Sequence, residues 1–214
     1  MSSHFVRLFQ SPGDNGDDDD DRAPRPRMPP WFGHPDDELG AVVPLGLVVG
    51  RSEGGVVALP HATVYSTGVA FDIVAIARGL SEARSSRLFY DQHGPFEEGE
   101  EPPPGFLRIG LELPDGERVS NLVGRRSRSL HMKPDEQPEG SVFIEHGGGG
   151  GSGGDGRVTL RPAFWLWPLP DRGTIQVFCE WPVVEIPLST IQVDGAVLAA
   201  AAARVVPLWP APSA

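Results

Sequence analysis

The chain of 214 residues carries 18 Lys and Arg against 29 Asp and Glu, which gives a formal net charge of −11. This length suits one domain with tails, and so acidic a chain is a poor ligand for nucleic acid or for an anionic membrane surface. The single Cys excludes an internal disulfide framework, and no stretch reaches the roughly 18 apolar residues of a membrane helix. The first residues lack a basic region followed by an apolar one, so we expect a cytoplasmic protein.

Residues 1–30 have the composition of a disordered tail. Residues 11–21 read SPGDNGDDDDD, and residues 22–30 read RAPRPRMPP. A block of like charge rich in Gly and Pro cannot bury enough apolar surface to offset the entropy lost on ordering. We therefore expect one folded domain over residues 31–210.

The first half of this domain reads as short strands separated by turn signals. Apolar side chains alternate with other side chains in residues 69–78 and 107–113, which is the period of a strand with one buried face. The sequence PDGE at residues 114–117 is typical of a β-hairpin turn. Further strands are expected at residues 39–51, 56–65, 118–123 and 141–146.

Residues 147–156 read GGGGGSGGDG, a composition typical of a flexible linker, so we interpret them as a mobile hairpin loop. Asp194 is a candidate N-cap for an Ala-rich helix over residues 195–206. Eight or more closely spaced strands followed by one helix predict an all-β protein. We expect an antiparallel β-sandwich, or a barrel-like sheet, with one short C-terminal helix.

Residues 157–185 hold three of the five Trp residues and the only Cys. We predict two long strands here, joined by the turn sequence PDRG at residues 170–173. The pairing that keeps apolar residues on one face places Phe164 directly opposite Cys179. Cys179 is then a buried, unreactive thiol, because a nucleophilic Cys needs a base and an electropositive setting.

The other face of this predicted hairpin carries Trp165, Trp167 and Arg161. An exposed face of this kind would stack on a sugar or another small ligand, which would make the protein a small-ligand or carbohydrate-binding module. The competing interpretation is that the C-terminal helix covers these rings, together with Phe178, as a second buried layer.

Residues 34–38 read HPDDE, which resembles the metal-binding motif of zinc-dependent N-acetylglucosaminyl deacetylases. In that family a His and an Asp ligate zinc and a neighbouring Asp acts as the base. The resemblance thus implies a metal-dependent hydrolase that uses His34, Asp36 and Asp37. The family motif follows an apolar parallel strand, whereas residues 22–31 contain four prolines and no apolar strand. The favoured interpretation is an acidic turn without a cofactor.

Three further motifs are WPLP at residues 167–170, FCEWP at residues 178–182, and AAAAR at residues 200–204 followed by LWP at residues 208–210. With these motifs the C-terminal third resembles a group of uncharacterised actinobacterial proteins. The resemblance implies a single-domain bacterial protein and brings no catalytic residues with it.

No set of residues converges on a catalytic chemistry in the sequence, so no catalytic residue is assigned. The favoured hypothesis is a non-enzymatic interaction or assembly module that binds a protein partner, with neither nucleic acid nor a membrane as partner. The metal-dependent hydrolase and the small-ligand module remain the alternatives.

Overall fold

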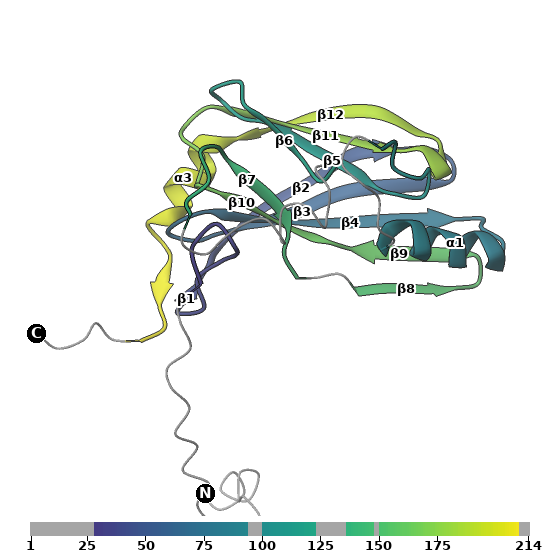
Figure 1. Cartoon of the computed structure of the whole chain (residues 1–214), viewed down its shortest axis with the longest axis horizontal. Helices are drawn as coiled ribbons and strands as arrows, with labels where there is room; N and C mark the ends of the chain where they lie inside the picture. The colour runs from purple at the N-terminus through teal and green to yellow at the C-terminus, as the bar shows by residue number, and fades with distance from the viewer. Residues whose placement is uncertain (1–27, 94–99, 123–135, 148–149, 210–214) are drawn as a thin grey trace, which may run out of the picture.

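The computed structural model describes residues 28–93, 100–122, 136–147 and 150–209. Within them the chain forms two antiparallel sheets packed face to face, as Figure 1 shows. The prediction of an all-β sandwich is confirmed, and the sheets do not close into a barrel. The tail predicted over residues 1–30 lies almost entirely outside the described residues.

The larger sheet is built around β4, which pairs with β3 on one side and with both β10 and β9 on the other. β10 pairs with the first half of β4 and β9 pairs with its second half, so β9 and β10 lie end to end along the same side of β4. The strands of this sheet are β2 (Ala41–Arg51), β3 (Gly55–Val64), β4 (Val69–Arg78), β7 (Val142–Glu145), β8 (Gly150–Gly154), β9 (Arg157–Arg161) and β10 (Ala163–Trp167).

The smaller sheet has the order β12-β11-β5-β6. Its strands are β5 (Arg108–Glu112), β6 (Arg118–Ser120), β11 (Thr174–Trp181) and β12 (Ile186–Asp194), with the 3-10 helix η2 (Pro182–Val184) between the last two. The predicted hairpin at residues 114–117 is confirmed, because β5 pairs with β6. Gly116 has a φ of 89° and donates its N–H to the carbonyl oxygen of Leu113 at 2.9 Å.

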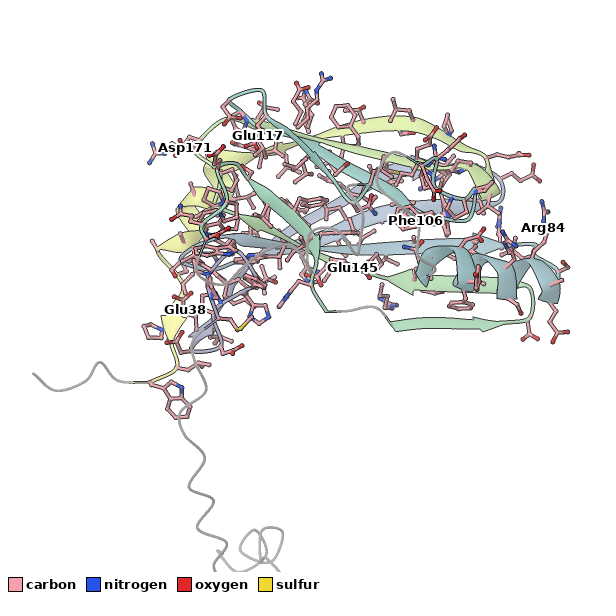
Figure 2. All side chains as sticks on the ribbon, in the orientation of Figure 1. Glu38, Arg84, Phe106, Glu117, Glu145 and Asp171 are labelled. Carbon is pink, nitrogen blue, oxygen red and sulfur yellow. The ribbon has the colours of Figure 1, made fainter. Side chains whose placement is uncertain are left out.

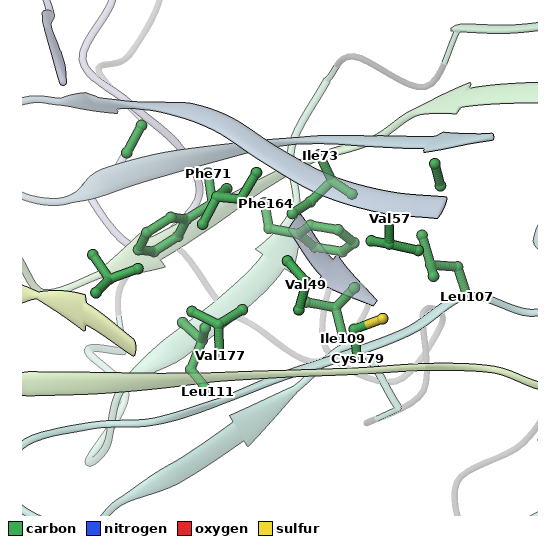
Figure 3. Packing of buried hydrophobic residues seen from close by; sticks show 14 of the residues in the cluster. Val49, Val57, Phe71, Ile73, Leu107, Ile109, Leu111, Phe164, Val177 and Cys179 are labelled. Atoms are coloured by element: carbon green, nitrogen blue, oxygen red, sulfur yellow. The ribbon is translucent and has the colours of Figure 1, made fainter. Parts of the chain in front are cut away.

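The core lies between the two sheets and is formed by the alternating apolar faces that the sequence predicts. Phe71, Ile73 and Phe164 point from the larger sheet towards Ile109 and Cys179 of the smaller one in Figure 3. All five are at most 2% exposed. The burial of these faces is the main stabilising contribution, at about 25 cal/mol for each Å² of apolar surface removed from water.

The predicted hairpin over residues 157–185 is wrong. β9 and β10 belong to the larger sheet, and β11 belongs to the smaller one. Residues 168–173 therefore cross between the layers. Phe164 and Cys179 both face the core, as predicted, but they face it from opposite sides and are not paired. Alternation fixes which side chains point inward, whereas it does not fix which strands are neighbours.

Two helices accompany the sheets. α1 (Glu82–His93) lies between β4 and β5 and has no counterpart among the elements expected from the sequence. The predicted C-terminal helix is confirmed as α3 (Gly195–Ala202), although it ends at Ala202 and not at Val206, which belongs to a strand. Asp194 caps it by accepting a hydrogen bond from the N–H of Ala196 at 2.8 Å. α3 packs against β2 and β3.

The glycine-rich loop predicted at residues 147–156 is wrong for its central part, because β8 (Gly150–Gly154) pairs with β9. The turn between them is Asp155-Gly156, with φ values of 51° and 71°, which is the backbone of a type I′ hairpin turn. The ring of Phe89 in α1 packs so closely on β8 that two positions of this strand have no room for a side chain. A Cβ on Gly151 would lie 2.3 Å from its Cε1 atom, and one on Gly153 would lie 3.0 Å from its Cε2 atom.

A short third sheet pairs β1 (Glu38–Leu39) with β13 (Val206–Pro207). We call this strand pair, together with Leu208 and Trp209, the terminal ribbon. It lies at one end of the sandwich, next to α3, in Figure 1. In the part of the chain that the structure describes, no helix is long and apolar enough to cross a membrane.

Replacing Gly151 with Val is expected to destabilise the fold by about 1–3 kcal/mol, because the new side chain occupies the place of the Phe89 ring. Gly154→Val is the matched control, since a Cβ there meets no atom within 4 Å. Urea unfolding measures both. Equal stability of the two variants would contradict the packing of Phe89 on β8.

Candidate functional site

Residues 29–37, which we call the N-terminal strap, lie over the outer face of the larger sheet. Trp165 of β10 donates its indole N–H to the carbonyl oxygen of Pro30 at 2.9 Å. The ring of Trp31 meets that of Trp167 edge-on, with centroids 5.5 Å apart. Because a buried indole N–H needs an acceptor, this hydrogen bond fixes where the strap crosses the sheet.

The strap, and not the C-terminal helix, covers the Trp165 face. Trp165 is 0% exposed, so its ring is unavailable for stacking on a ligand. Trp167 is half-buried and Arg161 is exposed. Phe178 does not belong to this surface at all, because it lies on β11 of the other sheet. The three residues predicted to bind a sugar therefore do not form one exposed surface, because Trp165 is buried, Trp167 is half-buried and only Arg161 is exposed.

His34 of the strap lies in an aromatic cluster that the sequence did not predict. Its ring stacks on Tyr65, with centroids 4.8 Å apart and an angle of 8° between the planes. It meets the ring of His146 edge-on, with centroids 4.9 Å apart. Gly33 allows this approach, because a Cβ there would lie 2.2 Å from Cε1 of His146. Tyr65 and His146 are far from His34 in the sequence, so only the fold brings them together.

Burial shifts two titratable groups of this cluster. Desolvation lowers the pKa of His146 below 6.5, and the neighbouring His34 lowers it further, whereas a backbone hydrogen bond with Phe32 and the charge of Asp36 act in the opposite direction. Desolvation raises the pKa of Tyr65 above 10.0, and the carboxylates of Asp72 and Glu38 add to that shift. The cluster therefore favours a neutral imidazole and a neutral phenol.

The residues of the HPDDE motif do not fit a zinc site of the deacetylase type. The ring of His34 is stacked on Tyr65, and its Nδ1 atom lies 3.3 Å from the carbonyl oxygen of Pro35. Asp36 is exposed and Asp37 is half-buried. Within residues 28–93, 100–122, 136–147 and 150–209, no group of three His, Cys, Asp or Glu side chains is placed to hold a metal ion. The motif also lies on an irregular strap rather than after a parallel strand.

Cys179 lies in the core between the sheets and is 1% exposed. Burial raises the pKa of its thiol to about 12, and the charge of Glu180 adds to the shift. The thiolate that a nucleophile requires is therefore strongly disfavoured, which agrees with the expectation of an unreactive thiol.

The strap leads directly into the terminal ribbon, which is anchored to the sandwich by polar contacts. The carboxylate of Glu38 accepts hydrogen bonds from the N–H and the hydroxyl of Ser66. The N–H of Leu208 donates to the carbonyl oxygen of Asp37 at 2.8 Å. These contacts matter because two short strands alone are only marginally stable in water.

The terminal ribbon exposes large apolar side chains. Leu39 is 60% exposed and Trp209 is 72% exposed, while Val206 and Leu208 are each about half exposed, at 52% and 49%. Leu39 and Val206 are direct partners in the strand pair, so their side chains lie next to each other on one face. Large contiguous apolar patches on a protein surface mark interaction sites, so the terminal ribbon is a candidate contact surface.

Comparison of the chain with protein-family models, with curated proteins and with solved structures finds no match. The resemblance to actinobacterial proteins stays a prediction.

The lowered pKa of His146 predicts a specific loss of stability in acid. The unfolded chain binds a proton to this imidazole at a higher pH than the folded chain does. Its contribution is therefore complete above pH 6.5 and is lost as the pH falls through the lower, folded-state pKa. Between about pH 8 and pH 5 the wild type should lose more stability than His146→Gln. Urea unfolding across this range measures the difference, and parallel curves would contradict the assignment.

Proposed function

We propose that this protein is a non-enzymatic interaction module that binds a protein partner through the terminal ribbon. The observation that carries the proposal is the exposure of four large apolar side chains on this short, anchored strand pair: Leu39, Val206, Leu208 and Trp209. Aromatic anchors such as Trp209 are enriched among the residues that contribute most to protein–protein binding.

The ribbon supplies both parts of a typical protein interface, an apolar centre and a polar rim. Val206 and Leu39 form the centre, while Asp36 is exposed on the adjoining strap. The chain carries a net charge of −11, so a partner with a net positive charge would associate faster and be favoured over an acidic one. We therefore propose a basic partner that presents an apolar segment to the ribbon.

Position also supports an interface at this end of the molecule. In Figure 2, Glu38 of β1 lies at one end of the sandwich, opposite the end that carries Arg84. Within the described residues β1 and β13 pair only with each other, so each keeps an outer edge to which an extended segment can add. The cytoplasmic location expected from the sequence remains part of this proposal.

The double variant Leu39→Ser/Trp209→Ser is expected to reduce binding of the partner by about tenfold or more, because it removes two apolar anchors. The wild-type protein and the variants are immobilised in equal amounts and exposed to host extract, and the retained proteins are quantified by mass spectrometry. Any retained protein is then purified, and its affinity for each variant is measured by calorimetry.

Leu188→Ser is the matched control. Leu188 is 68% exposed but lies on β12 of the smaller sheet, so its loss should leave binding unchanged. Equal binding by the wild type and the ribbon variant would contradict a ribbon interface. A wild-type protein that retains no partner and sediments as a monomer would contradict the interaction function itself.

A further inference from the structure

The outer face of the larger sheet has an open pocket of about 350 Å³. It lies at the strand ends that are farthest from the terminal ribbon. Three exposed arginines line it: Arg51 of β2, Arg78 of β4 and Arg157 of β9. Pockets of this volume lie within the usual size range of small-molecule sites.

Strand register explains how the arginines come together. Arg51 pairs with Val56 across β2 and β3, and Val56 pairs with Ile76 across β3 and β4. Arg78 follows Ile76 by two residues on the same face of β4 and pairs directly with Arg157 of β9. Side chains of four neighbouring strands thus lie on one side of the sheet and line the same pocket.

The arginines lack the partners that neutralise other arginines of this chain. Arg87, Arg108 and Arg118 form ion pairs with carboxylates. Among the described residues, Arg51, Arg78 and Arg157 form no ion pair. Arg78 uses its Nε–H to donate to the carbonyl oxygen of Glu53 at 2.8 Å, which leaves its terminal N–H groups available. The exposed Glu53 also lines the pocket, so the group keeps an excess of positive charge.

The cross-strand pair of Arg78 and Arg157 is the most informative contact of this region. Like charges placed directly opposite each other destabilise a sheet. None of the 29 acidic residues of the chain stands opposite either arginine at this position of the strand pair. A bound anion would convert the repulsion into attraction. Guanidinium groups match the oxygens of a phosphate with paired hydrogen bonds, and a dianion is favoured over a single negative charge.

The floor of the pocket indicates that the ligand also has an apolar part. Val56 and Ile76 are half-buried and adjacent in the sheet, so they present an apolar surface between the arginines. We infer that this pocket binds a small organic phosphate monoester, whose phosphate contacts Arg51, Arg78 and Arg157 and whose apolar part lies on Val56 and Ile76. The site is independent of the terminal ribbon and lies on the other end of the fold.

A single phosphate group distinguishes this ligand from a nucleic acid strand. The net charge of −11 repels a long polyanion, whereas a small dianion reaches the three arginines without bringing further phosphates near the acidic surface. The neighbouring hollow of about 430 Å³, which shares Arg78 and also contains Arg84, leaves room for a substituent.

Calorimetry of the full-length wild-type protein with 1-naphthyl phosphate tests the inference. We expect saturable binding that is about tenfold or more tighter than the binding of inorganic phosphate, which lacks the apolar part, and of 1-naphthoate, which carries one charge. A single-stranded oligonucleotide should bind more weakly than 1-naphthyl phosphate. No saturable binding of 1-naphthyl phosphate, or tighter binding of the oligonucleotide, would overturn the inference.

Arg51→Gln and Arg157→Gln should each weaken the binding of 1-naphthyl phosphate by about tenfold. Arg172→Gln is the matched control, since this exposed arginine follows Asp171 at the opposite end of the sandwich in Figure 2. The thermal unfolding midpoint without ligand shows that each variant is folded, and Arg157→Gln should not lower it, because the substitution removes a repulsion. Affinities equal to that of the wild type in both pocket variants would overturn the site.

Discussion

The hydrogen bond from the indole of Trp165 to the carbonyl oxygen of Pro30 decides how one end of this molecule is arranged. It orders the N-terminal strap on the outer face of the larger sheet, where His34 then lies between Tyr65 and His146. The strap in turn places β1 beside β13, and this pairing creates the terminal ribbon. This satisfied indole donor acts together with the hydrogen bonds from Ser66 to Glu38 and from Leu208 to Asp37, which hold β1 and β13 against the sandwich.

The two proposed surfaces depend on different physical properties of the same sandwich. The ribbon is proposed as a contact surface because its side chains are apolar and exposed, and no strand of the described residues lies beyond it. The arginine pocket is proposed as a binding site because three arginines that form no ion pair among the described residues line it beside an apolar floor. They lie at opposite ends of the sheets, so a protein partner and a small anion would not compete for space.

Local sequence patterns predicted the strands well, since alternation and turn chemistry act over a few residues. β4 begins and ends where the alternation over residues 69–78 places it, and the β5–β6 hairpin follows from its Pro-Asp-Gly turn. The same reasoning failed for β10 and β11. Both have an apolar face directed at the core, and a sandwich offers two ways to satisfy that requirement: pairing within one sheet, or facing each other across two sheets. The glycines of β8 were interpreted as a loop because the ring of Phe89, which occupies the space above Gly151 and Gly153, comes from a distant helix.

The sequence by itself determined the all-β class, the inward faces of the strands, the capped C-terminal helix and the burial of Cys179. Each of these depends on the period of a strand, on a turn, on a cap or on apolarity, all of which neighbouring residues specify. Only the tertiary structure decided which sheet each strand joins, what covers Trp165, and that Arg51, Arg78 and Arg157 line one pocket. Those outcomes depend on contacts between segments far apart in the chain, and the free energy of such contacts comes from shape and charge matching that no local pattern contains.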